Sequence, residues 1–478
     1  MGRGPEGVSA GRRPLWATVA TVVVCLAVGA LIALQGVSNL WLVGLGIALL
    51  PLLLLLDREV LVYLCFVATF TLNWLTLDVG VLPSQAQWLL EVCIALLLVR
   101  SLGTAYRRGS LRVPVIITAL FVAFALSAVV GISSGLSPVI VLLGLRKYLR
   151  FPAIALALVI APPQKGFERR AWQVIVACAA LEVVVSLVQL ATVGPGDLAT
   201  GTFGAGGTGF EAIFLVGVAS VVISRGVLGG GGIRFRDVML GLVLFVPAVI
   251  GSAVAAYFLL PACVIFGVLA FGRRPTKVIA TLAVVAVVVA VVAPYALEFT
   301  SSIGYVNASK LLSSPQAMLE YDRLATSNGR LGRIDQIAVA GSLTIGGDVN
   351  TALFGRGPAA ASVSSLGSAF NGPLSQDALV RWVDSSVAVT LIELGLVGLA
   401  VFIAVGVYAI VISVRTVRVS TDPDLTVLSA FAAIGGFLML VSGAYSVPWT
   451  IPGIALPFWV ALGAVMSRRM EQAPKEGE

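Results

Sequence analysis

Long apolar runs separated by short polar connections dominate the chain. An α-helix needs about 20 mainly apolar residues to cross a bilayer, and roughly 14 segments meet this requirement. They lie near residues 15–35, 39–56, 59–76, 86–105, 113–132, 138–161, 171–192, 208–225, 237–251, 253–272, 277–297, 385–413, 426–444 and 452–467. The run from 237 to 272 is too long for one crossing, so we expect a break near Gly251 and Ser252. The pattern predicts an all-α, polytopic transmembrane bundle of about 12–14 helices.

One long polar segment, from Glu298 to Asp384, interrupts this pattern. It separates an N-terminal bundle, residues 1–297, from C-terminal helices and a tail, residues 385–478. Within it, Ser314 and Pro315 are typical of a helix start. A second helix is expected to place Arg330 and Arg333 one turn apart. Its apolar face would consist of Leu331, Ile334, Ile337 and Ala338.

Composition supports lipid as the solvent and narrows the chemistry. Only 11% of residues are charged and the mean hydropathy is +1.03, whereas a soluble domain carries about 25% charged residues. The chain has no histidine, which removes the usual general base and the commonest metal ligand. All five cysteines lie in apolar runs, so no disulfide framework is expected. Without a dense carboxylate cluster, we expect neither a metal nor a cofactor.

The distribution of Lys and Arg predicts the topology. With the N-terminus in the cytoplasm, most basic residues fall on the inner side, and the outer connections 77–85, 132–137, 193–207 and 445–451 contain none. Both termini are then cytoplasmic and the long segment is extracytoplasmic. This asymmetry also explains the net charge of +8 without nucleic-acid binding. The run from Trp16 lacks a cleavage site and is expected to be a retained helix, not a signal peptide.

Nine basic residues do not follow this distribution. Three of them, Arg146, Lys147 and Arg150, lie in the sixth predicted span, where each charge costs about 2.5–3.5 kcal/mol. The other six lie in the long segment: Lys310, Arg323, Arg330, Arg333, Arg356 and Arg381.

Three explanations of the three basic residues in the sixth span stay open. They pair with intramembrane acids, for which the candidates are Glu91, Glu182, Glu211 and Glu393. They lie at the membrane interface. Or they form a cationic pocket for a phosphate or pyrophosphate group, which Arg binds through paired donors.

Other features have both a structural and a functional interpretation. The glycine-rich segment TGTFG (200–204) either forms a simple turn or presents backbone amides that bind an anion. Asp335 could form a local ion pair with one arginine. Asp384 could simply be the N-cap of the following helix.

Several segments, taken in order, resemble the bacterial O-antigen ligase/polymerase family. They are TGTFG after an outer connection, NGR followed by a helix and LFGRGPAA, and DSSVAVTLIELGLVGL. The resemblance spans roughly Leu145 to Leu399. It implies a glycosyltransferase of GT-C-like architecture in a bacterial inner membrane, acting on an undecaprenyl-pyrophosphate-type donor at the outer face.

The chain departs from that family at two places. Ligases of the family carry His-Asn where this chain has Asp384 and Ser385, so the resemblance favours the polymerase branch and leaves a carboxylate-dependent ligase as the alternative. The Asn often found after the TGTFG-like turn is also absent.

The expected reaction joins a polyprenyl-pyrophosphate-linked saccharide to a glycan or lipid-linked acceptor without a metal. Arg146, Lys147 and Arg150 would bind the pyrophosphate, and Arg330 and Arg333 would complete the clamp. Asp384 is the first candidate for the base, and Glu211 the second. A chain-length regulator or a flippase is a candidate partner. The rival from another class is a transporter of lipid-linked glycan, for which no inverted repeat is evident in the sequence.

Overall fold

The structure, a computed structural model, describes most of the chain after residue 55. The described ranges are 56–272 (without 78, 83–85, 87, 110, 205 and 230–231), 331–363, 370–377 and 384–472, with scattered residues between 276 and 316. Within these ranges the chain forms helices and no strand. Eight of the described helical segments are long and apolar enough to cross a membrane. The all-α, multi-pass membrane architecture predicted from the sequence is therefore confirmed, while the predicted spans 15–35 and 39–56 lie outside the described residues.

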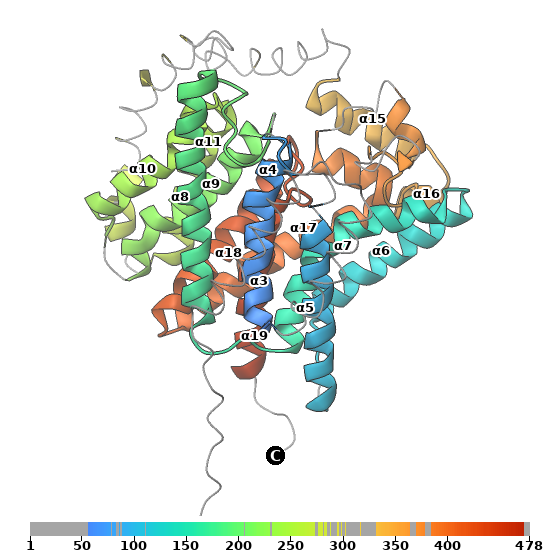
Figure 1. Cartoon of the computed structure of the whole chain (residues 1–478), viewed down its shortest axis with the longest axis horizontal. Coiled ribbons are helices and arrows are strands. Elements are labelled where there is room, and N and C mark those ends of the chain that lie inside the picture. The colour runs from blue at the N-terminus through green and yellow to red at the C-terminus, as the bar shows by residue number, and fades with distance from the viewer. Residues whose placement is uncertain are drawn as a thin grey trace, which may run out of the picture.

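The helices follow the predicted spans closely (Figure 1). Their bounds are α3 (Arg58–Val67), continued by a π-turn (Ala68–Leu72) and α4 (Asn73–Leu77), α5 (Trp88–Arg107), α6 (Val115–Ser133), α7 (Pro138–Ile160), α8 (Phe167–Val193), α9 (Thr208–Leu228), α10 (Phe235–Ile250), α11 (Val254–Phe271), α15 (Arg333–Ile345), α16 (Val349–Phe354), α17 (Ser386–Val419), α18 (Pro423–Ser442) and α19 (Pro452–Gln472).

The predicted break in the long apolar run is confirmed. Helix α10 ends at Ile250 and α11 starts at Val254. Between them Ser252 has φ 57°, in the left-handed region that a helix cannot continue through. The two helices are therefore separate elements, joined by residues 251–253.

Three of the predicted spans that the structure describes, α7, α10 and α19, are not among the eight. Helix α10 has only 16 residues. Helix α7 has 23 residues, but Arg146, Lys147 and Arg150 lie near its middle and no stretch of membrane length avoids them. Helix α19 has 21 residues, but its last turns contain Arg468, Arg469 and Glu471.

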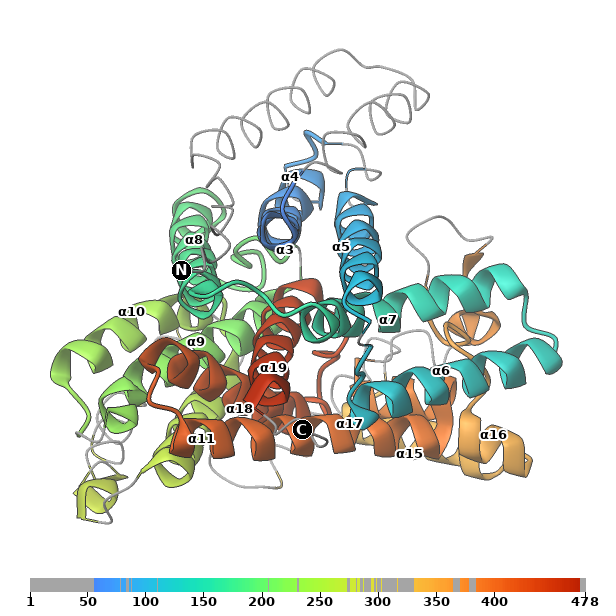
Figure 2. The same ribbon diagram turned by 90° about the horizontal axis from the view of Figure 1, so that it is seen from below.

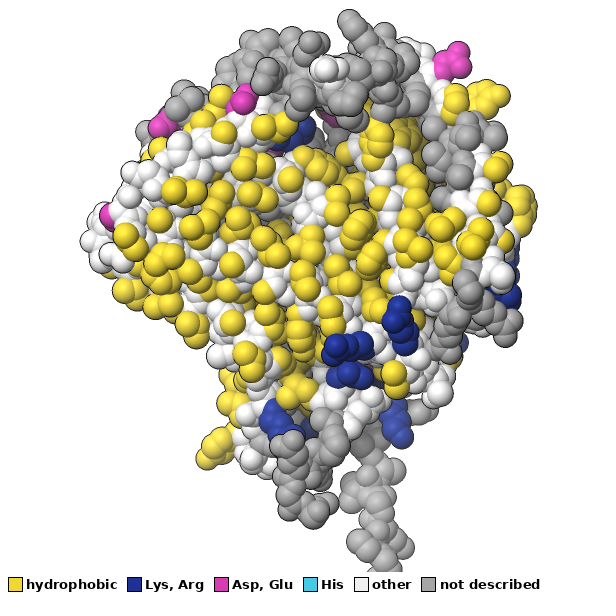
Figure 3. All heavy atoms as spheres, turned by 180° about the vertical axis from the view of Figure 1, so that it is seen from behind, with side chains coloured by type: hydrophobic (Ala, Val, Ile, Leu, Met, Phe, Trp, Pro, Cys, Tyr) yellow, Lys and Arg dark blue, Asp and Glu magenta, His cyan; other side chains and the backbone are white. Residues whose placement is uncertain are grey.

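Helix α9 forms the centre of the bundle. Nearly all of its side chains are buried, and it packs against α8, α10, α11, α18 and α19. Helix α8 is more peripheral and exposes Val184, Leu187 and Val188. Hydrophobic side chains cover a broad face of the molecule, with Lys and Arg gathered toward its lower end (Figure 3).

Three polar contacts place four helix termini at that same end of the bundle. Arg58 at the start of α3 donates to the carbonyl of Ala161 after α7 (2.9 Å). Arg170 in α8 pairs with Glu59 (2.6 Å). Arg468 in α19 pairs with Glu168 in α8. Alternating crossings predict this arrangement, although the contacts do not tell which side of a membrane this end faces.

The described part of the 298–384 segment lies against α17 and α6 (Figure 2). It comprises α15, α16 and a 3₁₀ turn, Pro373–Gln376. The helix expected from Pro315 lies outside the described residues.

The prediction for α15 is wrong in two respects. The helix begins at Arg333, after a non-helical Leu331 and Gly332, so Arg330 precedes it. Its buried face is Gln336, Ala340 and Thr344, while Ile334 is exposed. Thr344 donates to the carbonyl of Leu391, and Gln336 accepts from the amide of Asp384, while Ile337 and Leu343 pack beside Ala340. Hydrogen bonds and apolar contacts together therefore decide the buried face.

Candidate functional site

Two of the three basic residues of α7 face α5. Pro138 in the first turn starts this helix, and the four-residue spacing of Arg146 and Arg150 puts both on one face. Both approach Oε1 of Glu91: Nη2 of Arg146 at 2.8 Å and Nη1 of Arg150 at 3.5 Å. The predicted pairing with an intramembrane acid is confirmed for Glu91.

Further contacts fix these two guanidinium groups. That of Arg146 lies over the ring of Trp88, 4.4 Å from its centroid. Arg150 donates from Nη2 to the carbonyl of Thr450, just before α19 (2.8 Å). The side chain of Arg146 remains 29% exposed and that of Arg150 16%. Two cations thus share one carboxylate on a face that solvent or a ligand can reach.

Lys147 and Tyr148 point the other way, toward α17. Lys147 Nζ donates to Oγ of Ser362 (2.8 Å), and this hydroxyl donates to Oε1 of Glu393 (2.6 Å). The hydroxyl of Tyr148 donates to Oε2 of Glu393 (2.6 Å), and the amide of Ala361 donates to Oε1 (3.2 Å). Glu393 is fully buried, so this network compensates its charge inside the bundle.

The LFGRGPAA segment (353–360) passes between α6, α7 and α17. Helix α17 breaks at Gly395, which has φ 68°, so the carbonyls of Ile392 and Glu393 lose their helical partners. The amides of Arg356 and Gly357 donate to these carbonyls at 2.8 and 3.1 Å. Inserted backbone thus satisfies the polar groups that the break exposes within the bundle.

Glycines permit this close approach of backbones. A Cβ on Gly395 would lie 2.4 Å from the nitrogen of Gly355, and one on Gly144 would lie 2.4 Å from the carbonyl carbon of Pro358. Real side chains cannot occupy such positions, so the two helices and the inserted segment fit only with glycine here.

The glycine-rich TGTFG turn makes a separate polar cluster. The amide of Thr202 and its hydroxyl donate to Glu182 (amide to Oε2, 2.7 Å), and the amide of Gly201 donates to Gln189 (2.8 Å). The amides of Gly201 and Thr202, which were candidates for binding an anion, therefore donate hydrogen bonds to Gln189 and Glu182. In this respect the turn is structural.

Glu211, the second candidate for the base, lies in that cluster. It is 1% exposed and accepts a hydrogen bond from Ser186 (2.6 Å). A Cβ on Gly201 would lie 2.0 Å from Oε2 of Glu182 and 2.5 Å from Oε1 of Glu211, so both carboxyl groups converge on this glycine. Glu211 thus lies in the same cluster as Glu182. In the described part of the chain it makes no ion pair with Arg146 or Arg150, which pair with Glu91.

The segment 443–450 connects the intramembrane cations with the start of α17. Thr450 accepts from Arg150. The carbonyl of Ser446 accepts from the amide of Ser386 (2.8 Å), and that of Gly443 accepts from the amide of Val387 (3.2 Å). Sequence reasoning assigned this segment no role, because its connection to both elements is purely tertiary.

Tyr445 in this segment is a functional candidate that the sequence did not signal. Its hydroxyl is buried and has no hydrogen-bond partner in the described part of the chain. Burial raises the pKa of Tyr445, and the nearby charge of Arg333 opposes that rise. Arg333 at the start of α15 is therefore close enough to influence this phenol.

Asp384 lies at the entrance to α17, beside α15. Its backbone amide donates to Oε1 of Gln336 (2.9 Å), and its side chain is exposed. The N-cap is Ser385, whose hydroxyl accepts from the amide of Ala388 (3.4 Å). The alternative role of Asp384 as N-cap is therefore wrong. Arg330 and Arg381 lie outside the described residues.

The site has more basic side chains than the carboxylates that they contact. Arg146, Lys147 and Arg150 face two carboxylates, Glu91 and Glu393, through the contacts above. Such a surface can bind a polyanion, because guanidinium groups offer paired donors to phosphate oxygens. No group of three acidic or cysteine ligands suited to a metal occurs among the described residues.

No protein-family model and no curated protein matches this chain.

Proposed function

We propose that this protein is a membrane glycosyltransferase that polymerises polyprenyl-pyrophosphate-linked oligosaccharide units into a surface polysaccharide at the outer membrane face. The supporting observation is that Arg146 and Arg150 share the single oxygen Glu91 Oε1 while both remain partly exposed. This leaves positive charge near the middle of a membrane helix, where it is costly unless an anionic ligand uses it.

In the proposed reaction, an acceptor hydroxyl oxygen attacks the anomeric carbon of the donor saccharide. The bond between that carbon and the pyrophosphate oxygen breaks, and the lipid pyrophosphate leaves with the electron pair. Arg146 and Arg150 stabilise the developing negative charge. The hydroxyl proton passes to the carboxylate of Asp384. Lys147 holds the inserted segment through Ser362 and Glu393. Arg330 and Arg333, on the loop side, extend the clamp.

Reconstitution tests this proposal. Purified full-length protein in liposomes, given a lipid-pyrophosphate-linked oligosaccharide and no ion gradient, should produce a ladder of longer glycans. Arg146→Ala should slow formation of the ladder about 10²–10³-fold, whereas Arg108→Ala, which changes an exposed residue just beyond the end of α5, should keep it. A complete absence of chain growth with the wild-type protein contradicts polymerase activity.

One observation favours a transporter as the second candidate. Residues 199–202 are buried between α8 and α9, and their backbone contacts the acidic side chain of Glu182. Irregular backbone at membrane depth beside buried acids is common in transporters. Movement of labelled lipid-linked glycan across the liposome membrane without chain growth would support it. Transfer of one finished glycan to an acceptor, again without a ladder, would identify a ligase.

A further inference from the structure

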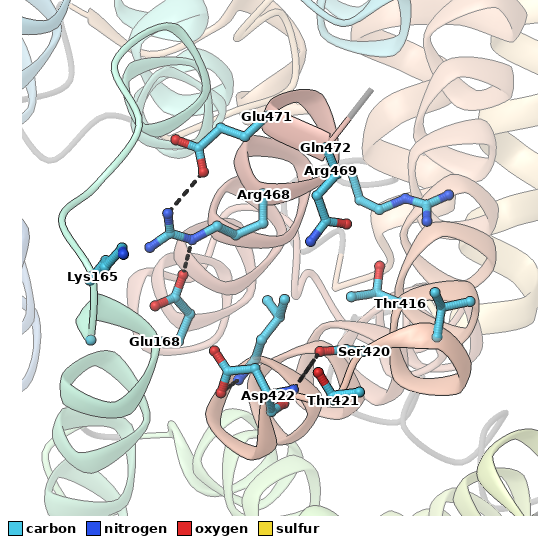
Figure 4. A pocket seen from close by; sticks show the side chains of 13 residues that line it. Lys165, Glu168, Thr416, Ser420, Thr421, Asp422, Arg468, Arg469, Glu471 and Gln472 are labelled. Carbon is cyan, nitrogen blue, oxygen red and sulfur yellow. Dashed lines mark hydrogen bonds and ion pairs between the residues drawn. The ribbon is translucent and has the colours of Figure 1, made fainter. Parts of the chain in front are cut away.

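A polar pocket of about 480 Å³ opens at the end of the bundle opposite Thr450 and the start of α17. Four segments form it: the α7–α8 connection, the start of α8, the α17–α18 junction and the end of α19 (Figure 4). The positive-inside pattern assigns this end to the cytoplasm. The pocket therefore plays no part in the proposed glycosyl transfer.

The acidic side chains that line the pocket already have partners. Glu168 and Glu471 both accept from the guanidinium group of Arg468, and Figure 4 shows Arg468 between them. Asp422 caps α18 by accepting from the amides of Asp424 and Leu425. Three carboxylates are thus satisfied within the pocket wall.

Two basic side chains in the pocket wall, unlike these carboxylates, have no such partner among the described residues. Lys165 and Arg469 make no hydrogen bond or ion pair with the described residues, and in Figure 4 they lie on opposite sides of the pocket. The hydroxyl group of Thr421 also lines the pocket. These groups can attract an anion with hydrogen-bond acceptors from two sides.

An apolar stripe on α17 leads to the same pocket. Ile403, Val407 and Val411 are exposed and lie one turn apart, so they form an apolar strip that winds gradually around the helix. Arg415 continues this spacing, and Val419, which is 73% exposed, reaches the pocket wall. The stripe offers a path for an acyl chain, and the basic residues at its end lie at the depth of a headgroup.

We propose that this pocket binds the phosphate-containing headgroup of an anionic phospholipid in the cytoplasmic leaflet, with Lys165 and Arg469 as its cationic ligands. Basic pockets between transmembrane helices on the cytoplasmic side are suited to such headgroups. The exposed apolar side chains of α17 favour a lipid over free phosphate, because only a lipid gains from apolar contact along the helix.

Native mass spectrometry of the full-length protein in detergent tests the proposal with phosphatidylglycerol as the probe and phosphatidylcholine as the neutral reference. Phosphatidylglycerol should bind the wild-type protein more tightly. The double variant Lys165→Ala/Arg469→Ala should bind it about thirtyfold more weakly, given the usual contribution of a basic residue near an anionic headgroup. Inorganic phosphate should not compete.

The matched control is Arg107→Ala/Arg108→Ala, which removes the same charge from the exposed end of α5. Its affinity for phosphatidylglycerol should equal that of the wild type. Unfolding midpoints without lipid verify that both double variants are folded. Equal binding by the pocket variant and the wild type, or equal binding of the two lipids, overturns the proposal. Full competition by inorganic phosphate overturns it in favour of a free-anion site.

Discussion

Two polar clusters within the bundle handle buried charge in opposite ways. On α7, basic side chains meet acids from α5 and α17, and Arg146 remains 29% exposed. Between α8 and α9, the acids Glu182 and Glu211 meet hydroxyl and amide donors and are at most 1% exposed. The first cluster has charge that a ligand can reach, whereas the second is closed by its own chain. The comparison teaches that intramembrane charge marks a site only where its partners leave it accessible.

The largest effect is expected from Glu393→Ala. This change leaves Tyr148 and the Lys147–Ser362 pair without their buried acceptor and loosens the inserted segment. Breaking a buried charged network of this kind costs about 3–5 kcal/mol. Thermal unfolding in detergent should show a clear loss of stability, and glycan chain growth should stop. Glu393→Gln, which keeps an acceptor for Tyr148, should be less damaging. Unchanged stability of the Ala variant would show that the network is dispensable.

A large effect on activity alone is expected from Arg146→Ala. Arg150 stays beside Glu91 in this variant, so the unfolding midpoint should change little. Removing one preorganised donor to a developing charge lowers kcat by about 10²–10³-fold. Rates of chain growth in liposomes measure this effect, and Arg146→Lys should restore part of the rate. If the Ala variant is destabilised and its rate per folded molecule is normal, the arginine is structural.

The matched pair Asp384→Asn and Glu211→Gln separates the two candidates for the base. Each removes one carboxylate and keeps the shape of the side chain. Asp384→Asn should lower the rate by about 10²–10⁴-fold, the usual contribution of a general base. Glu211→Gln should keep the rate of the wild type, because the closed cluster has no access to the acceptor hydroxyl. The reverse ranking would transfer the catalytic role to the α8–α9 cluster.

Tyr445→Phe is expected to have a smaller effect, which raises the stability of the protein and lowers its rate of chain growth. Removing a buried hydroxyl without a partner should stabilise the protein by about 1–3 kcal/mol. If substrate accepts a hydrogen bond from this hydroxyl, the same change should lower the rate about tenfold. Thermal unfolding and the rate of chain growth, measured on the same preparations, test both. A rate equal to that of the wild type would exclude Tyr445 from the site.

Most of the helical layout follows from the sequence, because each span must bury its own backbone polar groups in lipid and this requires a long apolar run. The bounds of α5, α6 and α7 lie within about two residues of the predictions, within the usual uncertainty of helix ends. The break at Gly251 and Ser252 could also be predicted from the local sequence, because the apolar run from 237 to 272 is too long for one crossing.

The site depended on tertiary structure to a larger degree. The sequence identified the basic residues of α7 and a set of acids that could pair with them, but spacing could not choose Glu91 and Glu393 from that set. Only the folded bundle determines that Gly395 breaks α17 and that the LFGRGPAA backbone replaces the lost hydrogen bonds. The sequence by itself determined which segments enter the membrane, because that depends on the chain's own transfer into lipid. The fold decided which charges meet and which stay accessible, because that depends on contacts between residues that lie from 55 to 300 positions apart in the chain.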